Sequence, residues 1–101
     1  MLEAARKIDT GTLYERKRVR MMLARIVESQ SGFAESEALL REGLALPAEA
    51  DSDPRLGFLL SRCLASQGNG VEARKVLAKL IATYPKHPII PTAKKTLEGM
   101  R

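Results

Sequence analysis

Four arginines of this chain fall at matched spacings that could present guanidinium groups to an acidic partner. Arg18 and Arg55 are 37 residues apart, and so are Arg25 and Arg62. Arg18 and Arg25 are also seven residues apart, as are Arg55 and Arg62, so each of these pairs would share one face of a helix. A guanidinium binds a carboxylate through two parallel hydrogen bonds. The arginines therefore predict a ladder that recognises carboxylates, which is a chemistry of binding and not of catalysis.

Apolar side chains accompany these arginines on the same expected helix faces. Methionine adapts its shape to different contacts, and phenylalanine adds apolar contact area. This combination suits an extended or helical peptide that bears acidic and apolar side chains. The expected binding residues are Arg18, Met21, Met22, Arg25, Arg55, Phe58, Leu59 and Arg62, with Ser29 and Ser66 on the same faces. The alternative is that the arginines form solvated pairs with Glu28, Glu35 or Glu42, which contribute about 0–1 kcal/mol each.

The sequence holds no recognisable catalytic or metal-binding set. His87 is the single histidine and lies between Pro85 and Pro88, where a loop or helix-cap role is expected. Cys63 is the single cysteine, which excludes an internal disulfide and a cysteine-rich zinc site, and its place in an apolar helical stripe predicts a core residue. The glycines of 68–70 lack the length and the lysine of a phosphate loop. We therefore expect no enzyme, no metal and no cofactor.

A basic run, Arg16-Lys17-Arg18-Val19-Arg20, contributes to the net charge of +5. Such a run can contact phosphates, so an α-helical nucleic-acid-binding module is an alternative function. Acidic residues are interspersed around the run and no stacking aromatic residues accompany it, which favours a solvated helix face. We therefore expect a protein partner and no nucleic acid.

Helices must position these residues, and the chain is predicted to be all-α. Apolar residues make up 45% of the sequence but aromatic residues only 4%, so the core must be aliphatic, which suits packed helices. Asp53 before Pro54 is expected to cap a helix, and Asn69 with Glu72 resembles a capping box. The expected helices are 2–8, 12–30, 33–46, 54–67, 71–84 and 91–100. The expected inward residues are Val19, Leu23, Ile26, Val27, Leu39, Leu40, Leu44, Leu56, Leu60, Cys63, Leu64, Val76, Leu77, Leu80, Ile81, Ala93, Leu97 and Met100.

The spacing of 37 residues extends to a sequence repeat. Leu23-Ala24, Val27, Ser31, Ser36 and Leu40 recur as Leu60-Ser61, Leu64, Gly68, Ala73 and Leu77. This order of large and small residues, with closing prolines at 47 and 85, resembles the tetratricopeptide repeat family over about residues 18–88. The resemblance implies a right-handed superhelix of helix hairpins whose first helices line a concave groove for a peptide or a partner subunit. A plain helical bundle is the alternative.

In some members of that family a clamp of Lys and Asn holds a C-terminal carboxylate. The Asn positions of that clamp fall at Arg25 and Arg62 here. This difference argues against a C-terminal carboxylate as the specific ligand.

A single domain over residues 1–101 is expected, with repeats at about 12–47 and 54–88 and a capping helix at about 91–101. Such stacks usually need about three repeats. We therefore expect either a piece of a longer array, with the helix at 2–8 as the tail of a preceding repeat, or a homo-oligomer. No apolar run approaches the roughly 18 residues that span a membrane. With no apolar signal core at its start, the chain is expected to be cytosolic unless it is a fragment.

Overall fold

The computed structural model of the 101-residue chain describes residues 11–30 and 32–99. These ranges hold five helices and no strand. The helices are α2 (Leu13–Ser29), α3 (Phe33–Ala45), α4 (Ser52–Ser66), α5 (Gly70–Thr83) and α6 (Ile90–Gly99). The all-α prediction is confirmed for this part of the chain. The helix expected at 2–8 and the core position Met100 lie outside the described residues.

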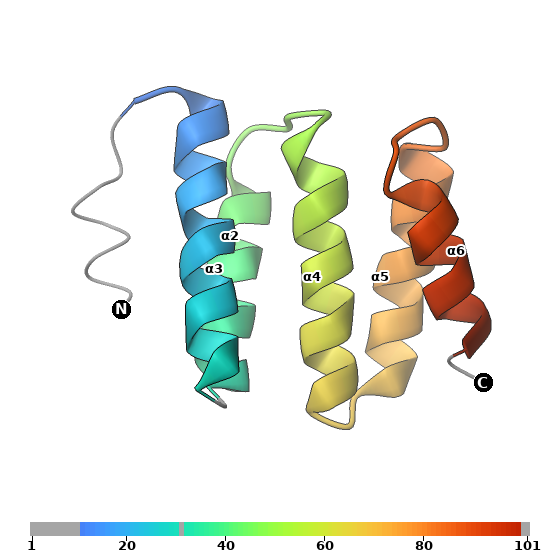
Figure 1. Ribbon diagram of the computed structural model, residues 1–101. Coiled ribbons are helices and arrows are strands. Elements are labelled where there is room, and N and C mark those ends of the chain that lie inside the picture. Colours follow the sequence, from blue (N-terminus) through green and yellow to red (C-terminus); the bar gives the residue numbers. More distant parts are fainter. Residues whose placement is uncertain (1–10, 31, 100–101) are drawn as a thin grey trace.

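The helices form two layers (Figure 1). Helices α2, α4 and α6 lie in front, and α3 and α5 lie behind them. Each helix packs on the next one along the chain, so that α2 pairs with α3 and α4 pairs with α5 as antiparallel hairpins. Helices α2 and α4 run in the same direction and contact each other more sparsely than either contacts its hairpin partner. The front layer therefore has room for a hollow between α2 and α4.

Local chemistry sets where the helices begin and turn. Thr12 and Glu15 form a reciprocal capping box at the start of α2, because the Thr12 hydroxyl accepts from the Glu15 N–H at 3.1 Å and the Glu15 carboxylate accepts from the Thr12 N–H at 3.1 Å. This hydrogen bonding lowers the pKa of the Glu15 carboxyl. Gly68, at φ 81°, makes the left-handed turn between α4 and α5 that other residues rarely adopt.

One predicted helix cap is at the wrong residue, and a second lacks the predicted capping hydrogen bond. The first residue of α4 is Ser52, so the cap position falls to Asp51, and Asp53 lies inside the first turn. The carboxylate of Asp53 is instead occupied by Lys17. Asn69 does stand at the cap position of α5, but its side chain makes no capping hydrogen bond.

The core reproduces the repeat. Four pairs of residues that are 37 apart are each at most 2% exposed: Ala24 and Ser61, Val27 and Leu64, Ser36 and Ala73, Leu40 and Leu77. The first cluster of buried residues joins α2, α3, α4 and α5, and the second joins α5 to α6 through Leu77, Leu80, Ile90 and Ala93. Equivalent positions of the two hairpins are therefore buried in the same way.

One predicted core position, Ile26, is wrong, because its side chain is 49% exposed. Val19 and Leu23 are only half-buried. The inward stripe of α2 consists instead of Lys17, Arg20, Ala24 and Val27, at helical spacing. The inward face of α2 thus begins with two charged residues, where the apolar pattern predicted aliphatic ones. Ile26 lies on the outward side of this helix.

The buried charges of α2 are paired. Lys17, 0% exposed, forms an ion pair with Asp53 at the start of α4. Arg20, 2% exposed, donates to the Glu42 carboxylate of α3 from Nε at 3.1 Å and from Nη2 at 2.9 Å. The expectation of a solvated face for the basic run is therefore wrong at Lys17 and Arg20. Burial forces these two to be paired, since an isolated buried charge is costly.

Asp53 gathers groups from three parts of the fold. Besides Lys17, its carboxylate accepts from the Glu49 N–H at 3.3 Å and lies 3.5 Å from the Tyr84 hydroxyl at the end of α5. Burial raises the pKa of the Tyr84 phenol, and the negative charge of Asp53 adds to that rise. The Lys17–Asp53 pair therefore joins the first hairpin to the open end of the second, where α4 begins and α5 ends.

We predict that Lys17→Met lowers the free energy of unfolding by about 3 kcal/mol, because it leaves the Asp53 carboxylate mostly buried without its cation. The double variant Lys17→Met/Asp53→Leu should lose clearly less than the sum of the two single changes, because it removes both charges together. Urea unfolding of the two single variants and the double variant measures this coupling. Strictly additive losses would show that the two side chains do not depend on each other.

Candidate functional site

The front layer carries a hollow of about 520 Å³ between α2 and α4. Its lining contains seven of the eight predicted binding residues, all but Arg62, and it lacks Ser29 and Ser66, which were expected on the same faces. The lining residues are Tyr14, Arg18, Met21, Met22, Arg25, Arg55, Phe58, Leu59 and Ile89. We call this the arginine hollow. Arg62 is exposed on α4 but lies outside the lining.

The arginine hollow has an apolar floor and a basic rim. Met21 and Leu59 pack on the first core cluster, while Phe58 and Ile89 pack on the second. Arg18 and Arg25 are exposed at the rim. Because the floor is anchored in both cores, the shape of the hollow follows from the packing of the two hairpins.

Two lining residues, Tyr14 and Ile89, were not predicted from the sequence. Tyr14 lies four residues before Arg18, so the helical spacing that selected Arg18, Met22 and Arg25 could also have selected Tyr14. Ile89 enters from the loop before α6, and no spacing along α2 or α4 points to it. Its place depends on how α6 packs against α5.

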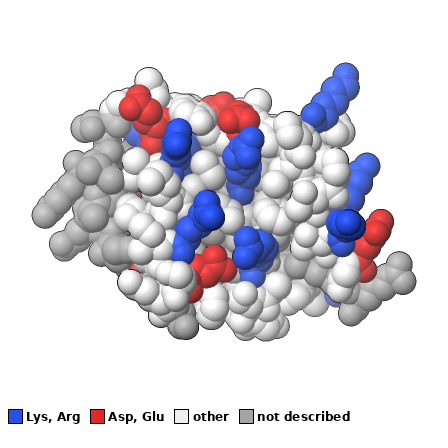
Figure 2. Space-filling view, in the orientation of Figure 1, with Lys and Arg blue, Asp and Glu red and all other residues white. Residues whose placement is uncertain are grey.

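Three of the four predicted arginines have no acidic partner among the residues that the structure describes. In the part of the chain that the structure describes, Arg18, Arg25 and Arg62 make no ion pair. Arg55 lies 3.6 Å from the Asp51 carboxylate, in an exposed pair that is open to water. Figure 2 shows Lys and Arg side chains over the middle of this face and along its right side, with acidic side chains at the top, at the right and just below the basic side chains of the middle.

The predicted alternative partners of the arginines, Glu28, Glu35 and Glu42, do not pair with them among the described residues. Glu42 instead receives the buried Arg20. Among the residues that the structure describes, the lining of the arginine hollow contains no Asp or Glu. The hollow therefore presents a positive charge that an acidic group from outside could neutralise.

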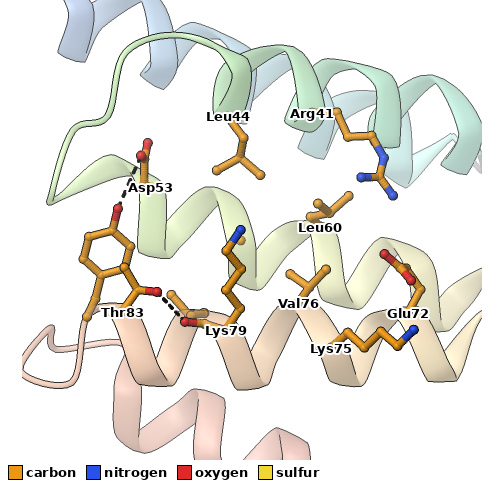
Figure 3. A pocket seen from close by; sticks show the side chains of 12 residues that line it. Arg41, Leu44, Asp53, Leu60, Glu72, Lys75, Val76, Lys79 and Thr83 are labelled. Atoms are coloured by element: carbon orange, nitrogen blue, oxygen red, sulfur yellow. Dashed lines mark hydrogen bonds between the residues drawn. The ribbon is translucent and has the colours of Figure 1, made fainter.

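A second hollow of about 440 Å³ lies between α3 and α5, with α4 as its floor (Figure 3). Its lining is Arg41, Leu44, Asp53, Gly57, Leu60, Glu72, Lys75, Val76, Lys79, Leu80, Thr83 and Tyr84. Side chains of α3 point down into it and side chains of α5 point up (Figure 3). Its lining carries charges of both signs, and two of them, Asp53 and Arg41, are paired with residues outside the lining.

The pairing within the second hollow is specific. Asp53 is held by Lys17, and Arg41 donates from Nε to Glu37 at 2.8 Å. Hydrogen bonds from Arg41 and then from Gln67 lower the pKa of the Glu37 carboxyl. Lys75 and Lys79 share the lining with Glu72. The described lining of the second hollow thus holds three cations and two anions, whereas that of the arginine hollow holds three cations and no anion, which makes the arginine hollow the better candidate site for an acidic ligand.

Two residues that line the second hollow, Gly57 and Leu80, stand where the repeats exchange a large and a small residue. Position 20 is Arg in the first hairpin and its equivalent, 37 residues on, is Gly57; position 43 is Gly and its equivalent is Leu80. A Cβ added at Gly43 would meet Leu56 Cδ2 at 3.1 Å and Arg20 Cδ at 3.6 Å. A Cβ added at Gly57 would meet only Leu80, at 3.8 Å and beyond. Gly57 therefore leaves open the space in which the second hollow forms.

The remaining chemically distinctive residues have structural roles. His87 lies in the loop before α6, as predicted; its Nδ1 accepts from the Ile89 N–H at 3.1 Å and its Nε2 lies 3.2 Å from the Asp51 carboxylate. Cys63 is 0% exposed, as predicted for a core residue, and its thiol donates to the Phe33 carbonyl at 3.0 Å. Burial raises the pKa of this thiol. Within 11–30 and 32–99, no cluster of three His, Cys, Asp or Glu residues could hold a metal ion.

Comparison with known proteins leaves the site to be judged on its geometry. No family model, no curated protein and no solved structure matches this chain. None of the described helices is both long and apolar enough to cross a bilayer.

We predict opposite effects of alanine at the two helical glycines. Gly57→Ala should raise the free energy of unfolding by about 0.5–1 kcal/mol, since alanine is the better helix former and its methyl group fits. Gly43→Ala should leave the free energy of unfolding at or below the wild-type value, because overpacking against the fully buried Leu56 costs about 1–3 kcal/mol. Urea unfolding of both variants checks this. Equal stabilisation by both would contradict the size exchange between the hairpins.

Proposed function

We propose that this chain is a non-catalytic protein-interaction module that binds an acidic segment of a partner protein in the arginine hollow. One observation carries the proposal: the hollow combines an apolar floor with a basic rim, and its lining within residues 11–30 and 32–99 has no acidic residue. Aromatic residues, Met and Arg are enriched at protein interfaces. Met22, 54% exposed, and Tyr14, 43% exposed, would add apolar area to a contact there.

We also propose that the hairpins α2–α3 and α4–α5 are tetratricopeptide-like repeats, followed by α6 as a capping helix. The matched burial at residues 37 apart supports this. In that arrangement α2 and α4 are the first helices of their repeats, which is where the family resemblance puts the ligand. A longer array and a homo-oligomer stay predictions from the sequence.

A protein partner fits better than nucleic acid. The alternative depended on the basic run, and two of its charges, Lys17 and Arg20, are buried in ion pairs and cannot reach phosphates. Much of the hollow is apolar: Met21, Phe58 and Leu59 lie in its floor. An acidic protein segment with apolar side chains complements both parts of this surface.

We predict that Arg18→Glu/Arg25→Glu abolishes capture of the partner from nuclease-treated native lysate. The reversal places two carboxylates at the rim, where an acidic segment would be repelled. The control Arg74→Glu/Lys86→Glu changes the net charge equally at exposed positions outside the hollow and should leave capture intact. Mass spectrometry of the retained proteins, with thermal unfolding to check each variant, makes the comparison.

Two results would contradict the proposal. Proteins retained equally by the wild type and the hollow variant would show that the arginine hollow is not the site. Retention that disappears entirely on nuclease treatment would transfer the function to nucleic acid.

A further inference from the structure

The arginine hollow offers an incoming backbone very few hydrogen-bond acceptors. The lining side chains that the structure describes are arginines, which only donate, and apolar groups; the single oxygen among these side chains is the Tyr14 hydroxyl. The carbonyls in the middle of α2 and α4 are already paired within their helices. A bound segment must therefore bring its own partners for its N–H groups.

This requirement separates the two conformations open to an acidic peptide. An extended peptide pressed into the hollow would leave the N–H groups that face the floor without acceptors, and each such buried group carries an uncompensated desolvation cost. An α-helix has its interior backbone groups paired before it binds. The hollow thus accepts a helix with a much smaller desolvation cost.

The spacing of the arginines fits the same conformation. Arg18 and Arg25 are seven residues apart on α2, or about 10 Å along the axis at 1.5 Å per residue. A helix lying along α2 would repeat its own side chains over the same distance at positions i and i+7. Arg55 faces the hollow from α4, and Arg62 continues that line seven residues further. Acidic residues on both flanks of a bound helix would then meet arginines on both sides.

Resting on the proposed function, we propose that the occupant of the arginine hollow is an amphipathic α-helix of a partner protein. The helix presents an apolar stripe to Met21, Phe58 and Leu59. It carries carboxylates at i and i+7 on the flanks of that stripe, which pair with Arg18 and Arg25 on one side and with Arg55 on the other. The complex is a third helix laid between α2 and α4.

Defined peptides test this directly. The probe is a stapled 22-residue helix with a leucine stripe and flanking glutamates, labelled for fluorescence anisotropy. The first control has the same composition, but its glutamates lie opposite the stripe. The second replaces two solvent-facing residues at its centre with proline, which breaks the helix and keeps the charges. We expect the probe to bind at least tenfold tighter than either control.

A charge exchange locates the contact. Arg18→Glu/Arg25→Glu should weaken binding of the probe at least tenfold, and a probe with lysine on the α2-facing flank should recover binding to that variant. Arg74→Glu/Lys86→Glu should bind the original probe as the wild type does. Such recovery cannot come from a variant that has failed to fold.

Each other outcome overturns the inference in a distinguishable way. Equal or tighter binding of the proline peptide would mean that the hollow takes an extended segment, and the proposed function would stand. No binding of any peptide, with a lysate partner still lost from the hollow variant, would reject the helix alone. No binding and no lost partner would reject both, and tighter binding of oligothymidine than of the probe would assign the face to nucleic acid.

Discussion

The Lys17–Asp53 ion pair is the interaction on which the arrangement of the two hairpins depends. Helices α2 and α4 contact each other sparsely. Their relative position is therefore set by α3, which packs on both, and by this buried pair near the beginning of both helices. Asp53 also binds the Glu49 N–H and lies beside the Tyr84 hydroxyl. Moving the hairpins apart would leave each charge buried without its partner, which is costly, so the pair favours the observed placement of α2 against α4. The front face inherits its shape from this constraint.

The same helix uses its cations in two ways. Successive residues of an α-helix point about 100° apart, since 3.6 residues complete a turn. Lys17 and Arg20 therefore turn inward and are neutralised by Asp53 and Glu42, while Arg18 and Arg25 turn outward and stay free of acidic partners in the described chain. A run that looks uniform in the sequence is divided by rotation into structural and exposed charges. Only the exposed ones are available for the recognition that we propose.

Sequence reasoning reached much of this architecture, for identifiable reasons. Glycine and proline breaks and helical spacing gave the order of the helices, and the spacing of 37 residues gave equivalent positions such as Val27 and Leu64, which share the same burial. The helical spacing of three, four and seven residues selected seven of the lining residues of the arginine hollow, because the residues on one face of a helix follow from its periodicity alone.

The failures occurred where long-range pairing decides. Lys17 could be recognised as a core residue only with knowledge that Asp53, 36 residues away, would meet it. Ile26 was wrongly placed inside because charged residues hold the inward stripe of α2. The second hollow could not be foreseen either, since its lining comes from three helices, α3, α4 and α5, whose side chains meet only in the packed fold.

The measurement that tests the central claim most directly is a selection of random peptides displayed on phage, carried out in parallel on the wild type and on Arg18→Glu/Arg25→Glu. The account predicts that the wild type enriches acidic sequences with apolar residues among them. The reversed variant should lose these sequences and enrich basic ones. Enrichment of the same sequences by both proteins, or of sequences without acidic residues by the wild type, would contradict the claim that the arginine hollow recognises acidic protein segments.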